Sequence, residues 1–262
     1  MDANDIRRLA RQTGYDPATL EKDYALTWLI AAIYAADSPL RTYLVFKGGT
    51  ALRKVYLPEW RLSEDLDFTI VGKPDPKVVR KDFDGVLKRL REASGIAYAF
   101  TSFHVSDFAI LGAVQFLGPL GFKNTIQLDI SRREPLADEP ARVSVRPEYG
   151  IGEFEAVVYS MDELLAEKIR SIMQRGKARD YYDVWRLFRE KRFDSEIIRN
   201  FVLKKCEGVR FAYDPGLVFD DARLEDARRF WEPALGRLTK DLPDFDRVIA
   251  DLRTALTFLN DI

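Results

Sequence analysis

Two aspartates on a short apolar segment are the residues of this sequence whose types and spacing point most directly to chemistry. Asp65 and Asp67 lie in residues 62–71, whose apolar residues predict a β-strand. Because side chains alternate along a strand, both carboxylates face one side, about 6–7 Å apart, while Leu66 and Phe68 face the other. Two like charges on one face are costly unless cations neutralise them, and carboxylate oxygens suit Mg²⁺. A polar surface strand is the alternative interpretation.

A glycine turn precedes this strand. Residues 44–46, Leu-Val-Phe, predict an earlier strand that stops at Gly48 and Gly49, and Thr50 then takes the usual position of a helix N-cap. Backbone N–H groups at such a turn attract an anion, typically phosphate. An anion cradle about 15 residues from a carboxylate pair is a layout for phosphoryl transfer.

A third acid lies in residues 126–130, Ile-Gln-Leu-Asp-Ile. The apolar residues of this predicted strand face one way, while Gln127 and Asp129 face the other. If the strands are neighbours, Asp129 points toward the first pair. It would then be a shared metal ligand or a base near an attacking hydroxyl. A solvated acid on an edge strand is the alternative.

The bulk composition excludes several classes of protein. The 262 residues are 47% hydrophobic and 32% charged, which predicts a soluble globular chain with a sizeable core. A net charge of −1 gives no overall attraction to nucleic acid or membrane. Cys206 and His104 are the only residues of their types, which excludes a disulfide within the chain and metal sites rich in Cys or His. We find no signal peptide and no apolar run that would span a membrane, so the expected compartment is the cytoplasm.

The order of predicted elements divides the chain in two. Helical patterns cover residues 5–36 and 77–93, and β-rich runs separated by Gly or Pro fill residues 96–159. From residue 161 onward the pattern is helical to the end. We therefore expect a first domain at residues 1–159 and a helical domain at residues 160–262.

One lysine of the second half lies where a helix should be apolar. In the predicted helix over residues 161–175, Lys168 falls in the middle of the apolar stripe. A lysine in that position needs a partner or a function. It either snorkels along the helix, or it points at a triphosphate or a catalytic carboxylate. Asp180, at the start of the next helix, is either an N-cap or the partner of Lys168. Asp183 lies farther from the apolar arc.

The turn between these two helices is basic. Residues 160–210 contain 13 Lys or Arg and 9 Asp or Glu, a local net charge of +4. Arg175, Lys177 and Arg179 cluster at the turn. They form either a solvated face or a contact surface for a nucleic-acid backbone.

An ordered set of motifs resembles the AbiEii/MenT group of nucleotidyltransferase-like toxins, within the DNA polymerase β-type superfamily. The matching segments are FKGGTALRK at 46–54, RLSEDLDF at 61–68, LDIS at 128–131, ELLAEKIR at 163–170 and RDYYD at 179–183, with EKDYAL at 21–26 as an earlier match. The resemblance covers about residues 20 to 190.

The resemblance implies an α+β fold, in which a mixed β-sheet flanked by helices is followed by a helical C-terminal domain that completes the active site. It implies transfer of a nucleoside monophosphate from an NTP to a hydroxyl, with release of pyrophosphate. Asp65, Asp67 and Asp129 would hold two Mg²⁺ ions, for which Mn²⁺ could substitute, and Asp129 would favour deprotonation of the acceptor.

The remaining roles also follow from the resemblance. Gly48, Gly49 and Thr50 would bind the phosphates with Arg53 nearby, and Lys168 would bind the triphosphate. Asp180 would either assemble the site or position the acceptor. An RNA acceptor, with the tRNA 3′ end expected, would be modified and translation blocked. A separately encoded antitoxin would be the partner.

Two other functions compete with this one. A nucleotidyltransferase of the same fold could modify a small molecule or a protein, and a non-catalytic module could simply bind nucleotides. The intact set of Asp65, Asp67 and Asp129 argues against the second. The basic segment favours RNA over a small acceptor.

Overall fold

The computed structural model describes residues 1–260 and divides them into two compact units. The sheet unit consists of Met1–Arg133 and Pro140–Tyr159. The helical unit consists of Glu134–Glu139 and the chain from Ser160 onward. The segment 134–139 thus belongs with the helices, although the sequence pattern placed it in the first domain. None of the helices within residues 1–260 has the length and apolar character needed to cross a bilayer.

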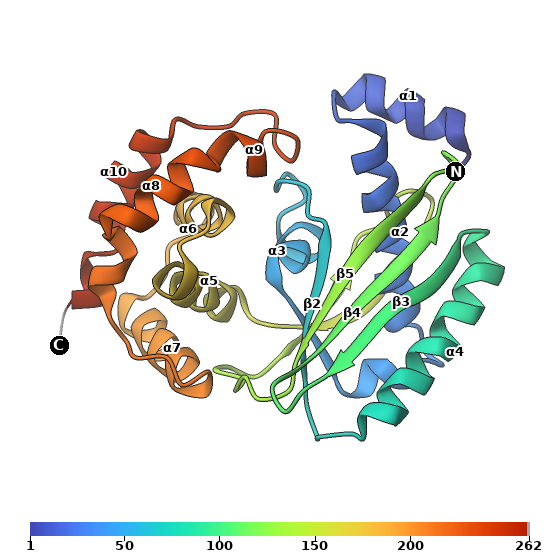
Figure 1. Cartoon of the computed structure of the whole chain (residues 1–262), viewed down its shortest axis with the longest axis horizontal. Coiled ribbons are helices and arrows are strands. Elements are labelled where there is room, and N and C mark those ends of the chain that lie inside the picture. Colours follow the sequence, from blue (N-terminus) through green and yellow to red (C-terminus); the bar gives the residue numbers. More distant parts are fainter. Residues whose placement is uncertain (261–262) are drawn as a thin grey trace. The chain divides into compact units, whose positions relative to one another are not determined.

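Seven strands of the sheet unit form one mixed sheet in the described part of the chain (Figure 1). Their order is β3-β4-β5-β2-β1-β7-β6, with β2–β5 and β1–β7 parallel and the other neighbours antiparallel. The strands are β1 (Leu44–Lys47), β2 (Asp65–Ile70), β3 (Ala97–Val105), β4 (Ala109–Leu117), β5 (Lys123–Ser131), β6 (Ala141–Val145) and β7 (Phe154–Val158). The predicted α+β fold with a mixed sheet is confirmed.

Helices pack against one face of this sheet and leave the acids on the other. The helices of the unit are α1 (Ala3–Thr13), α2 (Pro17–Ile33), the short α3 (Gly48–Ala51) and α4 (Pro76–Ser94). Apolar residues of α2 and α4 share a core with Leu66, Phe68 and Leu128, all of which are buried. Because side chains alternate along β2 and β5, the aspartates between these core residues must face away from the core.

The helical unit is built from six α-helices within the described residues. They are α5 (Met161–Arg175), α6 (Ala178–Glu190), α7 (Ser195–Gly208), α8 (Asp221–Arg229), α9 (Trp231–Leu235) and α10 (Phe245–Ala255). The Ser160 hydroxyl caps α5 by accepting from the Glu163 N–H, and Gly176, with φ +57°, ends it. This tight corner sets the start of α6 directly after the end of α5.

A buried ion pair explains why residues 134–139 belong to the helical unit. Lys205 Nζ lies 2.5 Å from Glu163 Oε1, and both side chains are fully buried. The Ala137 N–H donates to Glu163 at 2.7 Å, and Lys205 donates to the Pro135 carbonyl at 2.9 Å. The segment therefore satisfies two charges that would be costly inside the helical core without it.

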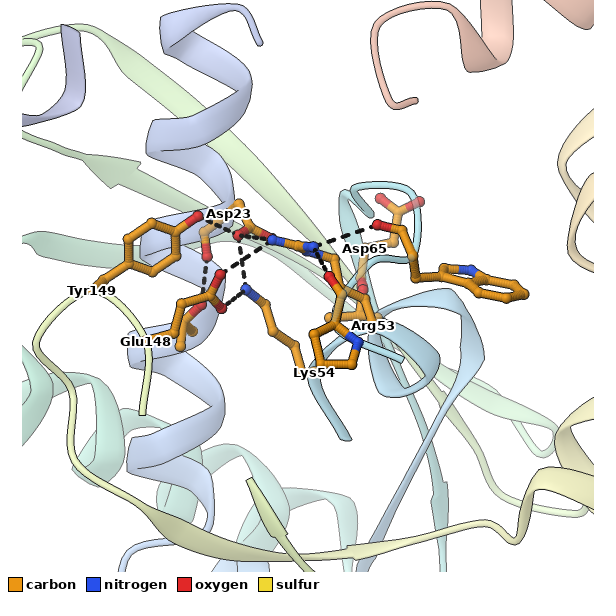
Figure 2. A network of polar contacts seen from close by, with 10 residues as sticks. Asp23, Arg53, Lys54, Asp65, Glu148 and Tyr149 are labelled. Carbon is orange, nitrogen blue, oxygen red and sulfur yellow. Dashed lines mark hydrogen bonds and ion pairs between the residues drawn. The ribbon is translucent and has the colours of Figure 1, made fainter. Parts of the chain in front are cut away.

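A second ionic network holds the chain just after the glycine turn (Figure 2). Helix α3 continues as one π-helical turn, Leu52–Tyr56, which carries Arg53 and Lys54. Asp23 of α2, which is 1% exposed, accepts from Lys54 Nζ at 2.8 Å and from Arg53 Nη2 at 3.3 Å. Glu148 accepts from the same two cations, at 2.5 Å and 3.1 Å. Two cations and two carboxylates thus tie α2 and the 148–149 loop to the π-helical turn.

Tyr149 completes this network. Its hydroxyl donates to Asp23 Oδ2 at 2.5 Å, and its backbone has a φ of +57°, an uncommon value for a bulky residue. Burial by itself raises the pKa of Asp23, but the charges of Lys54 and Arg53 outweigh burial and lower that pKa to about 2. Asp23 is therefore ionised in the folded protein at neutral pH.

We predict that Asp23→Asn lowers the free energy of unfolding by about 3 kcal/mol at pH 7, because Lys54 stays buried with one carboxylate fewer. An unfolded Asp has a pKa of about 3.9, so the ionised carboxylate stabilises the fold fully above about pH 5. This contribution is lost as the pH falls toward 2. The difference between wild type and variant, measured by urea unfolding with circular dichroism, should shrink accordingly.

Asp84→Asn is the matched control. Asp84 forms an ion pair with Arg80 on the surface of α4, with its side chain 54% exposed. Its replacement should change the free energy of unfolding by no more than about 0.5 kcal/mol. If Asp23→Asn lost the same stability at pH 7 and pH 2.5, the charge of Asp23 would not be the cause.

Candidate active site

Three aspartates line the side of the sheet that faces away from its helical core. Asp65 and Asp67 lie on β2, and Asp129 lies on the parallel neighbour β5. The register pairs Asp67 with Asp129 and Asp65 with Gln127. Adjacent strands are about 4.8 Å apart, so the carboxylates of Asp67 and Asp129 lie side by side. The structure therefore brings together three acids from distant parts of the sequence, on the face where alternation predicted them.

The glycine turn packs directly against one of these acids. Gly48 follows β1 with a φ of +76°, and a Cβ built on it would lie 2.1 Å from Asp67 Oδ2. A Cβ on Gly49 would lie 2.9 Å from Arg61 Nη2 and 3.2 Å from Ser63 Oγ. A side chain at Gly48 would collide with the Asp67 carboxylate and displace it. Backbone N–H groups, a carboxylate, a guanidinium and a hydroxyl therefore converge at the turn.

Thr50 is not the helix N-cap that the sequence suggested. Helix α3 begins at Gly48, and its N-cap is Lys47, because the left-handed φ of Gly48 turns the chain into the helix three residues earlier. The Thr50 hydroxyl instead donates to the backbone carbonyl of Asp65 at 2.6 Å. This bond fixes the distance between the glycine turn and the carboxylate strand.

Arg53 lies within the network of Figure 2. Besides Asp23 and Glu148, its Nη1 donates to the carbonyls of Pro58 at 2.8 Å and Trp60 at 3.4 Å. It holds the loop that leads into β2. A phosphate would have to compete with these partners for its guanidinium.

Two cations to which the sequence pattern gave no role lie beside the acids and the glycine turn. Lys47 pairs in register with Asp67 across β1 and β2, and its side chain is buried, with Nζ 5.9 Å from the ring centroid of Tyr159. Arg61 is 3% exposed beside Gly49. Strand alternation could have identified Lys47, because it follows the apolar run of β1 directly. Arg61 lies in an irregular loop, where no sequence periodicity indicates which way a side chain points.

The helical unit contains a compact charge cluster of its own. Lys168 Nζ lies 3.3 Å from Asp180 Oδ1 and 2.8 Å from Asp183 Oδ2. Arg175 also donates to Asp180, with Nε at 2.9 Å from Oδ2. Both aspartates are almost fully buried. The lysine in the apolar stripe of α5 is therefore explained by two carboxylates on α6.

This cluster decides between the two alternatives for Asp180, in favour of pairing with Lys168, and corrects the expectation for Asp183. The N-cap of α6 is Lys177, so Asp180 does not cap it, because the helix begins earlier at Ala178. Asp183, thought to lie off the apolar arc, is fully buried because it lies one helical turn from Asp180 and shares its face. Burial by itself raises the pKa of Asp180, but Lys168 and Arg175 outweigh burial and lower that pKa to about 2.

The three residues proposed from the sequence to contact RNA all have partners within the helical unit. Arg175 binds Asp180, Lys177 Nζ lies 3.3 Å from Asp226 Oδ2, and Arg179 Nε donates to the Ala234 carbonyl at 3.2 Å. Replacing each of these residues would have a different effect on the buried charges of the helical unit. Changing Arg175 would also disturb the buried Asp180, whereas Lys177 pairs at the surface.

Asp65, Asp67 and Asp129 offer only carboxylate oxygens, which are the ligand type that hard divalent cations prefer. Among residues 1–260, however, no group of three or more Asp, Glu, His or Cys side chains is already gathered tightly enough to hold an ion. An ion would draw the carboxylates of neighbouring strands together, which requires rotation of their side chains and no change in strand register.

The contact between Gly48 and Asp67 generates a stability prediction with an internal control. Gly48 and Gly72 have nearly the same φ, +76° and +77°, but a Cβ on Gly72 would meet nothing within 4 Å. Gly72→Ala should cost about 1 kcal/mol from backbone strain alone. Gly48→Ala should cost about 1–3 kcal/mol more, because its methyl group displaces Asp67. Urea unfolding of both variants measures the difference, and equal losses would show that only the φ value matters.

Comparisons with known proteins identify the family and the fold. Residues 31–256 match the family model described as nucleotidyl transferase AbiEii toxin, type IV TA system. An uncharacterized protein of Aquifex aeolicus (strain VF5) is 27% identical over 191 residues, which are 71% of this chain and 79% of that protein. Among solved structures, MenT4, a nucleotidyltransferase toxin from Mycobacterium tuberculosis H37Rv, superposes with a TM-score of 0.71 at 23% identity, covering 100% of this chain and 90% of that chain.

The family match extends over most of the chain, and the structural match shows the same fold. Family membership implies nucleotidyltransferase activity with an NTP substrate, and it indicates an antitoxin as partner. Such toxins typically use a divalent metal ion. The chain belongs to the AbiEii family of nucleotidyltransferase toxins of type IV toxin–antitoxin systems.

Proposed function

We propose that this protein transfers a nucleoside monophosphate from an NTP to an RNA acceptor, with the tRNA 3′ end as the expected site, and thereby blocks translation. The observation that supports this most strongly is the direct pairing of Asp67 with Asp129 beside the Gly48 turn. Carboxylates for a cation and backbone N–H groups for phosphate then stand at one place on the sheet. The substrates place the reaction in the cytoplasm.

The chemical step is an in-line displacement at the α-phosphorus. The acceptor hydroxyl oxygen forms a bond to the α-phosphorus, the bond from that phosphorus to the α–β bridging oxygen breaks, and pyrophosphate leaves with the electron pair. Asp129, the most exposed of the three acids, takes the proton of the acceptor hydroxyl. Asp65, Asp67 and Asp129 would hold Mg²⁺, proposed as two ions, for which Mn²⁺ could substitute. The ions would neutralise charge on the phosphoryl oxygens.

The other residues bind and orient the nucleotide. Gly48, Gly49 and the start of α3 present N–H groups to the phosphates, and Thr50 keeps this turn in register with Asp65. Arg53 adds positive potential behind the turn. Lys168 binds the triphosphate, and Asp180 fixes the direction of Lys168 through their 3.3 Å contact.

Replacement of one metal-binding acid should abolish the reaction. We predict that Asp67→Asn lowers incorporation of α-labelled NTP into RNA by at least about 100-fold, because charge developing on the α-phosphate loses its counter-charge. Asp107→Asn, an exposed carboxylate in the turn between β3 and β4, should leave the rate unchanged. A chelator should stop the wild-type reaction and added Mg²⁺ should restore it. Undiminished labelling by Asp67→Asn would rule out the metal-binding role.

Lys168 requires a compensated variant, because its loss leaves two buried carboxylates short of a cation. Lys168→Met alone should lower the free energy of unfolding by about 3–5 kcal/mol. The double variant Lys168→Met/Asp183→Asn removes one charge of each sign and should regain much of that stability, with Arg175 still bound to Asp180. If Lys168 acts on the triphosphate, nucleotide transfer by the double variant stays lost. Recovery of transfer together with folding would make Lys168 purely structural.

The acceptor and the donor nucleotide are identified by one experiment. Total RNA is incubated with the protein, Mg²⁺ and each α-labelled NTP in turn, and the products are separated by size. Label in the tRNA size range with one preferred NTP supports the proposal. Label in protein or small molecules, with none in RNA, would favour another acceptor for the same chemistry.

A further inference from the structure

A half-open pocket lies in the helical unit, where α6 begins and α8 meets α9. Its volume is about 320 Å³, and it is lined by Lys177, Ala178, Arg179, Phe230 and Ala234. Pockets for small ligands have volumes of about 300–1,000 Å³, so this one suits a single nucleotide-sized group. None of its lining residues belongs to the carboxylate site of the sheet.

Phe230 is an exposed aromatic residue that does not contribute to the core of the helical unit. Its neighbours Ala227, Trp231 and Leu235 are buried, whereas Phe230 is 44% exposed. Trp231 packs edge-on against Phe245, with ring centroids 5.2 Å apart, so the aromatic core of this region is complete without Phe230. The guanidinium carbon of Arg229 lies 4.7 Å from the Phe230 ring centroid and adds positive charge next to the ring. An exposed aromatic ring beside cations is the arrangement on which nucleobases stack.

Two cations, Lys177 and Arg179, also line this pocket. The Lys177 side chain is 59% exposed, and its ammonium pairs with Asp226, which is partly exposed itself. Arg179 donates from Nε to the Ala234 carbonyl at 3.2 Å, which anchors the plane of its guanidinium at the pocket. Helix α6 begins here without a side-chain cap, so the positive end of its dipole adds to the same field. Asp226 pairs with both Lys177 and Arg229, which leaves these three groups with a net charge of +1, and Arg179 adds a second positive charge at the pocket lining, so the pocket favours phosphate.

We propose that this pocket binds one unpaired nucleotide of the RNA acceptor, with the base stacked on Phe230 and the flanking phosphates held by Lys177 and Arg179. This inference rests on the proposed function, because it takes RNA as the acceptor. The combination of an aromatic face with cations favours a nucleotide over an acidic peptide, which would need the cations alone. Asp180, the residue after Arg179, binds Lys168.

The test compares two probes with the same backbone. A fluorescein-labelled, unstructured RNA 10-mer and its abasic counterpart are titrated by fluorescence anisotropy at several salt concentrations. Phe230→Ala should weaken binding of the RNA by roughly 5- to 100-fold, the effect of losing one stacked base, and should leave the abasic probe unchanged. Phe230→Tyr should bind both probes like the wild type. Lys177→Ala should weaken both probes and lower the salt slope by about 1.

Ile197→Ala is the matched control, since Ile197 is an apolar side chain on α7 that is 43% exposed and lies outside the pocket. It should change neither affinity. Equal binding of the RNA by Phe230→Ala and the wild type, with both folded by circular dichroism, would overturn the proposal, as would an equal loss for the abasic probe.

The same variants separate this inference from the proposed reaction. In nucleotide transfer, Phe230→Ala should raise the KM for RNA and leave kcat and the KM for NTP unchanged. If wild type transfers no nucleotide to RNA but binds it through Phe230, the pocket stands and the reaction fails. If transfer to RNA proceeds with the same KM in wild type and Phe230→Ala, the reaction stands and the pocket fails.

Discussion

The contact between the Gly48 backbone and the Asp67 carboxylate is the constraint on which the sheet unit depends. A Cβ at Gly48 would lie 2.1 Å from Asp67 Oδ2, so any residue other than glycine would displace that carboxylate. The left-handed φ of Gly48 also starts α3 there, and it places the N–H groups of the turn next to the carboxylate strand. The attraction for phosphate and the attraction for a cation therefore come from atoms in contact. The core packing of Leu66 and Leu128 fixes which way the acids point.

Charge compensation follows one rule in both units. In the sheet unit Asp23 is buried against Lys54 and Arg53, and in the helical unit Asp180 is buried against Lys168 and Arg175. The pKa of each aspartate falls to about 2, because nearby cations outweigh the effect of burial. Each cluster joins elements that hydrogen bonds of the backbone do not connect: α2 with the π-helical turn, and α5 with α6. Charged residues of this kind usually lie on helix surfaces. Here they are buried in pairs, and the pairs hold in place the segments that carry the proposed site.

Strand periodicity predicted the acid face, because alternation along β2 and β5 needs only local sequence. The register of Asp67 with Asp129 and the order of the strands needed the fold. Helix starts were less predictable. The N-cap pattern suggested Thr50, but the left-handed glycine began the helix earlier, and the same kind of shift at Lys177 removed Asp180 from the cap position. Segment 134–139 was assigned to the wrong part of the chain, because its tie to the helical unit through Glu163 and Lys205 spans distant residues. Lys168 was identified because a cation in an apolar stripe violates a local rule, whereas Asp183 and Arg61 violate none.

The distribution of charge bears on how an RNA would be selected. The whole chain has a net charge of −1, and the basic corner between α5 and α6 already has its cations next to carboxylates or carbonyls. Phosphates must then compete with Asp226 and with the Ala234 carbonyl for Lys177 and Arg179, which reduces the gain from each phosphate contact. Nonspecific binding of duplex RNA, which offers backbone charge but no accessible base faces, should be weak on such a surface. An exposed aromatic ring adds binding energy only for a strand whose bases are unstacked, because only such a base can stack on the ring. If RNA is the acceptor, as proposed, this combination of compensated cations and one exposed ring would favour unpaired strands without any reading of sequence.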